Sequence, residues 1–158
     1  MKEIVTFFLS GKLYGVDVNR MQAIENYEEM IKMPGMPENL QGFISLRGDI
    51  LPVIDIKKQF RLPQAEVTAE TKYVILQTTQ GKLVVVADGV SRIIKADGND
   101  VQEFPKLLRT EATSYVEYIV KNENQLILAI DAENFLSEDA WKVIRELVAE
   151  IKAGGNDD

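Results

Sequence analysis

Short apolar runs separated by turn-forming residues follow one another along the chain as far as about residue 131. Four pairs of these runs are joined by short polar connections, which is typical of β-hairpins. The predicted hairpins pair residues 4–10 with 12–18, 43–46 with 50–56, 73–79 with 82–87, and 115–120 with 125–130. The pattern therefore predicts a mainly β protein.

Two features modify individual strands of this prediction. Residues 73–76 and 83–86 are apolar without alternation, which indicates strands buried on both faces. Pro52 lies inside another run, and proline has no amide hydrogen to donate to a neighbouring strand. We therefore expect the strand that contains Pro52 to be an edge strand, or to be bulged at that point.

The chain divides into two halves that echo each other. Residues 61–71 are polar and irregular and contain Pro63, which predicts a connecting loop. Gly-Lys-Leu opens the second strand of a hairpin at residues 11–13 and again at 81–83, and Ile-Asp closes a strand at residues 54–55 and again at 130–131. Such short matches give a weak indication of a repeated β unit.

Helical periodicity appears in the last part of the chain. Ser137 is placed to cap a helix, and Glu138 and Asp139 follow at its positive end. The apolar residues of one face are Trp141, Ile144, Leu147, Val148 and Ile151. We expect this face to pack on the β structure and residues 153–158 to form a disordered tail.

A shorter helix or tight turn is expected after the first hairpin. Asn19 is a plausible cap, and Met21 and Ile24 follow with a spacing that one helical turn would bring to the same side. Closure of the core is the simplest role for these two apolar side chains.

Composition excludes several classes of function. The 158 residues contain no cysteine and no histidine, so disulfides, thiolate metal sites and every histidine-dependent catalytic system are ruled out. Eighteen basic and 25 acidic side chains give a net charge of −7, which disfavours nucleic acid and anionic membrane surfaces as partners. The first residues already read as a strand, without a signal or membrane-spanning segment, and we expect a cytoplasmic protein with no direct membrane insertion.

The aspartates give no clear catalytic pair. Asp55 and Asp131 each follow a strand and precede a helical stretch, so capping of those helices is the favoured interpretation. Residues 97–100 resemble a calcium loop only faintly, and we interpret them as a turn. With no phosphate-binding glycine motif either, no cofactor and no metal are expected.

The most informative segment is residues 42–60, in which Arg47 stands at a tight turn between two apolar runs. A rigid hairpin would present its planar guanidinium outward, where the fork of donors suits a carboxylate or backbone carbonyls of a partner. An ordinary solvated turn arginine is the alternative.

This segment, Gly-Phe-Ile-Ser-Leu-Arg-Gly-Asp-Ile-Leu-Pro-Val-Ile-Asp-Ile-Lys, closely resembles the CheW family of chemotaxis adaptors. Matching pieces occur in family order at residues 14–18, 86–90 and 126–131. The resemblance implies a single domain at residues 1–152, built from two interleaved, five-stranded SH3-like β-barrels packed together, with short helices and a C-terminal helix. It also implies two partners, methyl-accepting chemotaxis receptors and a CheA-type histidine kinase.

The resemblance further implies a groove for the receptor tip. Its residues here would be Met21, Ile24, Gly42, Ser45 and Arg47. Ser45 stands where the family usually has asparagine, and Ala23 and Glu25 depart from the charges of some relatives. Kinase-contact residues stay unknown, although the family would place that contact on the first barrel.

Three functions are therefore compared. The leading hypothesis is a non-enzymatic scaffold that couples receptor tips to the kinase. A generic β-barrel protein-binding module outside chemotaxis shares the expected fold, so only its partners would distinguish it. A hydrolase that uses two carboxylates is the third, and it requires a pair facing each other across a pocket.

Overall fold

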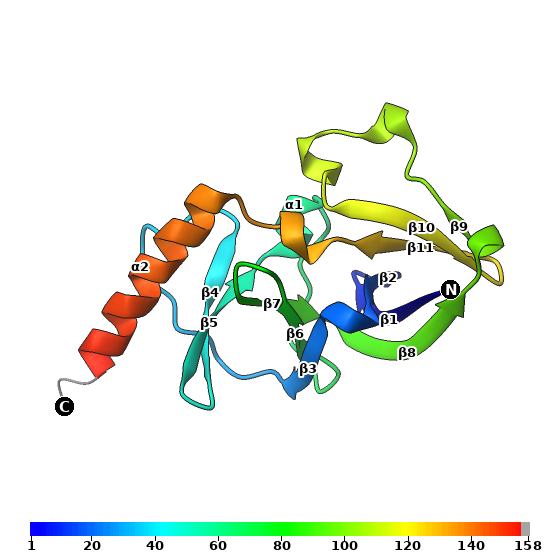
Figure 1. Cartoon of the computed structure of the whole chain (residues 1–158). Helices are drawn as coiled ribbons and strands as arrows, with labels where there is room; N and C mark the ends of the chain where they lie inside the picture. Colours follow the sequence, from blue (N-terminus) through cyan, green and yellow to red (C-terminus); the bar gives the residue numbers. More distant parts are fainter. Residues whose placement is uncertain (156–158) are drawn as a thin grey trace.

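The computed structural model describes residues 1–155, apart from the side chain of Ala112, and arranges eleven strands in two sheets (Figure 1). The first sheet has the order β8-β1-β2-β11-β10-β9 and the second the order β3-β6-β7-β5-β4. The strands of the first sheet are β1 (Lys2–Leu9), β2 (Lys12–Asp17), β8 (Gly89–Ala96), β9 (Val101–Gln102), β10 (Val116–Asn122) and β11 (Gln125–Ile130). Those of the second are β3 (Met21–Asn26), β4 (Leu40–Leu46), β5 (Asp49–Ile54), β6 (Lys72–Gln77) and β7 (Lys82–Ala87).

The mainly β class with two packed β units and a C-terminal helix is confirmed, but the first sheet has six strands where five were expected. The sixth is β9, which contains two residues and pairs with β10 through Val101 and Gln102. So short a strand lacks the alternating pattern that the sequence prediction needs.

Each sheet takes strands from both halves of the chain. Hairpin β1-β2 pairs with β8 and with β11. In the second sheet, β3 pairs with β6 and β5 with β7 of the later hairpin, and β4 pairs with β5. The strand pairs β2-β11 and β5-β7 are parallel, and all other strand pairs are antiparallel. The Gly-Lys-Leu and Ile-Asp echoes of the sequence thus occupy equivalent places in the two sheets.

Four apolar clusters stabilise this arrangement, the smallest of which contains Phe104, Val116 and Ile119. One is enclosed by the first sheet and contains Ile4, Val120 and Ile127, and another is enclosed by the second sheet and contains Tyr73 and Val84. The largest cluster lies between the sheets and also receives side chains of the C-terminal helix. Burial of apolar area in the largest cluster holds the two sheets together.

All four expected hairpins are present, and strands β6 and β7 are buried on both faces as predicted. The turn between β4 and β5 lies at Arg47 and Gly48, one residue earlier than expected. Both residues have positive φ, 52° and 87°. Two central residues of that kind define the tight turn that best matches the twist of a hairpin.

The expectation for Pro52 was wrong. Strand β5 lies inside the second sheet between β7 and β4, and the irregularity of the β4-β5 pair lies at Gln41, not at Pro52. The parallel register with β7 begins only at Val53, so Pro52 faces β4 as its single strand neighbour. The missing amide hydrogen therefore interrupts no ladder.

The helix or turn expected over residues 21–25 was also wrong. A 3₁₀ turn, η1 (Val18–Arg20), is capped by the Asp17 side chain, and β3 then begins at Met21. Residues of β3 alternate between half-buried and exposed, and the strand pairs with β6. Pairing with a distant strand here overrides the local helical spacing.

Helical segments connect and cover the sheets. They are α1 (Ile56–Gln59), the 3₁₀ turns η2 (Gly98–Asp100), η3 (Lys106–Leu108), η4 (Glu111–Thr113) and η5 (Ala132–Asn134), and α2 (Glu138–Gly155). The Ser137 hydroxyl accepts a hydrogen bond from the Ala140 amide at 3.1 Å, as the expected cap requires. The predicted apolar face of α2 packs on the central cluster, with Trp141 and Ile144 buried. The helix extends through Gly155, beyond the expected start of the tail, and residues 156–158 lie outside the described part.

Candidate functional site

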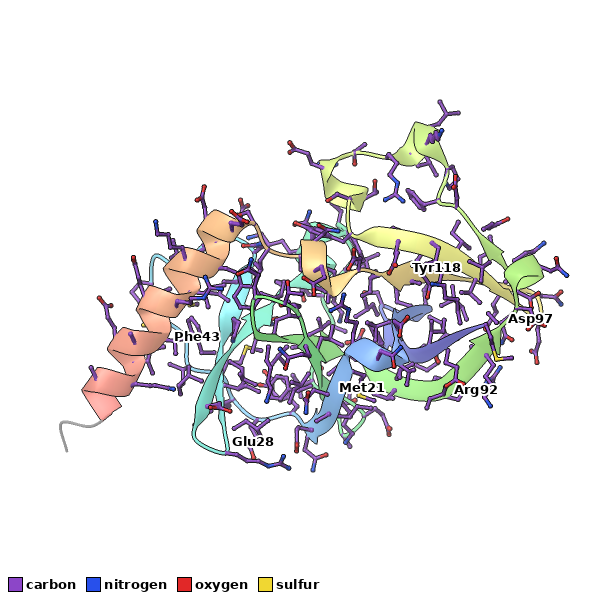
Figure 2. The ribbon with its side chains drawn as sticks, in the orientation of Figure 1. Met21, Glu28, Phe43, Arg92, Asp97 and Tyr118 are labelled. Carbon is purple, nitrogen blue, oxygen red and sulfur yellow. The ribbon has the colours of Figure 1, made fainter. Side chains whose placement is uncertain are left out.

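The candidate receptor residues lie on β3, on β4 and on the turn after β4, all in the second sheet. Residues 27–35, here called the strap, leave β3 and run past β4. Ile31 and Phe43 exchange two backbone hydrogen bonds of 2.7 and 2.9 Å, so the strap covers the outer edge of β4. Figure 2 places Met21 near the start of β3 and Glu28 just after its end.

A cleft of about 270 Å³ opens where the strap, β3 and β4 meet. Its apolar lining comes from the strap, β4 and β6, and its charged lining comes from glutamates of β3 and the strap. The lining residues are Glu25, Asn26, Glu28, Glu29, Ile31, Ile44, Ser45, Leu46 and Tyr73. An apolar floor with an acidic border suits an apolar side chain flanked by basic groups.

Arg47 stands at one end of this cleft. Its side chain is 80% exposed, and its Nη2 lies 3.5 Å from Glu25 Oε1. That contact is long and open to water, so it contributes little to stability and leaves the guanidinium available to a partner.

The other expected receptor residues differ in their roles. Ser45 is exposed and lines the cleft, and Ile24 is 37% exposed on β3. Met21 is half-buried and packs against the central cluster. Gly42 is buried beneath the strap, where an added Cβ would lie 2.9 Å from the Ile31 carbonyl oxygen and 2.9 Å from Met30 Cβ.

The structure thus brings Ser45 and Arg47 together at the cleft, near Glu25, and gives Met21 and Gly42 packing roles. Glycine at position 42 permits the close approach of the strap. Tyr73 supports the strap from below, since its hydroxyl donates a hydrogen bond to the Glu28 carbonyl. Burial, with a smaller contribution from Tyr27, raises the pKa of Tyr73 to about 12, so the hydroxyl remains a neutral donor.

A second exposed surface was missed by the sequence analysis. Leu107 is 99% exposed and Leu108 57% exposed in η3, on the long β9-β10 connection (residues 103–115). Two adjacent exposed leucines at the tip of a connection are unusual on a protein surface that has no partner. The signal was the Lys-Leu-Leu-Arg run at residues 106–109, which belongs to no strand or helix pattern.

The aspartates behave as helix caps. Asp55 accepts a hydrogen bond from the Lys58 amide, and Asp131 accepts one from the Glu133 amide, both at 3.0 Å. Asp131 also lines a hollow of about 400 Å³ that contains Asp17 and Glu117. Within residues 1–155 no group of three or more acidic side chains has the geometry to hold a metal ion.

The structure is therefore a β domain of two packed sheets with a small surface cleft. The strap covers the outer edge of β4, and an exposed arginine lies at the turn that follows β4. The chain belongs to the CheW-like domain family, whose model matches residues 3–140.

Three relatives illustrate the similarity. The chemotaxis protein CheW of Bacillus subtilis is 29% identical over 139 residues, covering 88% of this chain and 89% of that protein. The chemotaxis protein CheW of Klebsiella aerogenes is 25% identical over 143 residues, covering 90% and 86%. The crystal structure of the scaffolding protein TtCheW from Thermoanaerobacter tengcongensis has a TM-score of 0.79 at 30% identity, covering 88% of this chain and 94% of that one.

No helix in the described part of the chain is both long and apolar enough to span a membrane.

Proposed function

We propose that this protein is a non-enzymatic cytoplasmic scaffold that couples the tips of methyl-accepting chemotaxis receptors to a CheA-type histidine kinase. Membership of the CheW family supports a chemotaxis adaptor, and the relatives are named as chemotaxis and scaffolding proteins. The cleft beside Arg47 is the single observation that carries the receptor part of the proposal.

The receptor face consists of the cleft, Arg47 and the exposed part of β3. A receptor tip is helical, and a helix docks by inserting apolar side chains into a groove while charges set its orientation. Ile44 and Leu46 provide the apolar contact, and Arg47 is free to bind a carboxylate or a carbonyl. Glu25, Glu28 and Glu29 favour a tip that carries basic residues at the matching edge.

The kinase face is the tip of the β9-β10 connection, at Leu107 and Leu108. This tip belongs to the first sheet, whereas the receptor cleft belongs to the second. Figure 1 shows the connection and the β4-β5 turn projecting from opposite ends of the molecule. One rigid body can therefore hold both partners at once, and a shift of the receptor would alter the populations of kinase conformations without any chemistry in the scaffold.

The receptor face is tested with Arg47→Ala, with Arg92→Ala on β8 as an exposed arginine control. We expect Arg47→Ala to weaken binding of a receptor cytoplasmic fragment about tenfold, while kinase binding and the fold remain unchanged. Binding is measured by co-sedimentation or calorimetry, and folding by circular dichroism. Equal loss of both partners, or unfolding, would contradict the proposal.

The kinase face is tested with Leu107→Ser, with Leu126→Ser as its control. Leu126 is also well exposed but lies on β11, away from the connection. We expect Leu107→Ser to weaken binding of the kinase regulatory domain by about tenfold or more and to spare the receptor. Unchanged kinase binding would remove this tip from the kinase contact.

Failure of both partners to bind the unmodified protein would favour a generic β-barrel binding module instead. The carboxylate hydrolase would regain support only from turnover of a compound by the purified chain that stops with Glu117→Gln, because Glu117 in the acidic hollow has a raised pKa. Burial and the nearby Asp131 cause that shift.

A further inference from the structure

A second, larger cavity lies between the first sheet, the end of α1 and the β9-β10 connection, and shares no lining residue with the receptor cleft. Its volume is about 610 Å³, within the range of small-molecule sites. The residues that line it come from β2, from the end of α1, from β10 and β11, and from the β9-β10 connection. They are Tyr14, Phe60, Arg61, Phe104, Thr110, Glu111, Thr113, Val116 and Leu128.

The inner walls are aromatic and aliphatic. Tyr14 and Phe60 stack with ring centroids 5.7 Å apart, and Phe104, Val116 and Leu128 belong to one apolar cluster with Phe60. Aromatic walls of this kind favour a flat or branched apolar group.

The β9-β10 connection covers this cavity as a roof, and its own contacts hold it in place. Arg109 lies over the Phe104 ring at 5.2 Å and donates a hydrogen bond of 2.6 Å to the Val116 carbonyl. The Thr113 hydroxyl donates to the Leu108 carbonyl and accepts from the Thr110 amide, both at 2.8 Å. These bonds fold the β9-β10 connection back onto β10, and Figure 1 shows it returning beside α1.

Polar groups without partners stand around this apolar space. The Tyr14 hydroxyl makes no hydrogen bond to any described residue, and it is not among the buried polar atoms that lack a partner, so it reaches the solvent at the cavity. Arg61 and Glu111 both line the mouth, and neither forms a salt bridge with any described residue, including each other. The mouth thus offers one cation and one anion that are too far apart to pair directly.

We propose that this cavity binds a small zwitterion with an apolar body, such as an aromatic amino acid or an apolar dipeptide. The carboxylate of the ligand would pair with Arg61 and its ammonium group with Glu111, while its apolar part lies between Tyr14, Phe60 and Phe104. A ligand with both charges satisfies both rim groups at once, which a fatty acid or a neutral aromatic compound does not.

The inference extends the proposed function, because the same connection that roofs the cavity carries Leu107 and Leu108. A bound ligand would hold that tip in one position and so favour kinase docking. The binding site itself does not depend on that function, and the test therefore uses neither receptor nor kinase.

The test is calorimetric titration of the purified full chain with the dipeptide L-Phe-L-Leu. Its N-acetyl derivative lacks the ammonium group, and its C-terminal amide lacks the carboxylate. The variants are Arg61→Gln and Glu111→Gln, each with a matched control. Arg92→Gln controls for loss of an exposed cation, and Glu103→Gln controls for loss of an exposed anion on the same connection.

We expect saturable binding at one site, with backbone amide shifts at Tyr14, Phe104 and Leu128 in NMR spectra. Arg61→Gln should lower the affinity for the dipeptide about tenfold without changing the affinity for the C-terminal amide. Glu111→Gln should lower the affinity for the dipeptide by a similar factor without changing the affinity for the N-acetyl derivative. The controls should bind as the unmodified protein does. Absence of saturable binding, or binding that ignores either variant, would overturn the proposal.

Discussion

Lys57 and Asp88 form an ion pair that ties the two sheets together, with Lys57 Nζ 2.5 Å from Asp88 Oδ1. Lys57 follows strand β5 of the second sheet, and Asp88 follows strand β7 and also accepts a 2.7 Å hydrogen bond from the Ser10 amide in the β1-β2 turn. The Lys57 side chain is 7% exposed and that of Asp88 is 23% exposed. This difference in burial decides which of the two residues can be replaced with the smaller loss in the free energy of unfolding.

The first prediction compares removal of each partner. Asp88→Asn leaves a nearly buried ammonium group unpaired, so we expect it to lower the free energy of unfolding by about 3 kcal/mol. Lys57→Met leaves a carboxylate that still has water and the Ser10 amide, and should cost about 1 kcal/mol. Urea denaturation measures both values.

The double variant provides the control for this prediction. Because Lys57→Met removes the charge that Asp88→Asn leaves unpaired, the double variant should be more stable than Asp88→Asn alone. Additive losses would show that the two residues do not interact.

A second prediction concerns a related set of contacts elsewhere in the molecule, where Glu133 joins Arg20 to the β6-β7 turn. Arg20 Nη1 lies 2.6 Å from Glu133 Oε1, and the Thr79 amide and hydroxyl both donate to Glu133. Burial opposes ionisation of Glu133, but these hydrogen bonds and the ion pair outweigh it and lower its pKa.

A carboxyl whose pKa is lowered in the folded state stabilises the protein above its unfolded pKa and loses that contribution as the pH falls through the folded value. Glu133→Gln should therefore cost about 1 kcal/mol at pH 7, and the cost should shrink as the pH falls below the ordinary value of 4.5. Urea denaturation at several pH values measures the difference, with Glu150→Gln on the exposed face of α2 as control. A cost that stays constant with pH would contradict this account.

The sequence predicts the local parts of this fold but not the pairing of distant strands. The four hairpins were predictable, because each depends on neighbouring apolar runs and a local turn. The exchange of strands between sheets was not, because nothing local in β3 selects β6 as its partner. Met21 and Ile24 have a helical spacing in isolation, and only the pairing with β6 makes that segment a strand.

The candidate site shows the same division. Exposure of Arg47 followed from the hairpin around it, and capping by Asp55 and Asp131 followed from their positions after strands. The packing of Gly42 against the strap depends on the path of residues 27–35, which carries no periodic pattern. The exposure of Leu107 could not be predicted from the sequence either, because apolar residues are ordinarily assigned to a core.

The third prediction uses Gly42 to separate packing from binding. Gly42→Ala places a methyl group 2.9 Å from the Ile31 carbonyl oxygen and from Met30 Cβ, so the strap must move. We expect a loss of about 1 to 3 kcal/mol in the free energy of unfolding, with weaker receptor binding as a consequence. Gly98→Ala is the matched control, because no atom lies within 4 Å of its added Cβ. Weaker receptor binding at unchanged stability would instead place Gly42 in direct contact with the receptor.

The fourth prediction concerns the tie between Tyr73 and the strap. Tyr73→Phe removes the hydroxyl that donates to the Glu28 carbonyl, and should lower the free energy of unfolding by about 1 kcal/mol at pH 7. Tyr115→Phe is the matched control, since the Tyr115 hydroxyl makes no hydrogen bond to a described residue. Urea denaturation of the two variants should therefore give different midpoints.

The same tie predicts a dependence on alkaline pH. Burial raises the pKa of Tyr73 from 10.0 to about 12 in the folded protein. The stabilisation that this shift provides is fully present below pH 10, and it is lost as the pH rises toward and through the folded value. The unmodified protein should thus lose stability above pH 10 more steeply than Tyr73→Phe does. Ultraviolet absorbance of the phenolate should show one fewer late-titrating tyrosine in the variant, and equal alkaline slopes for the two proteins would contradict the assignment of the shift to Tyr73.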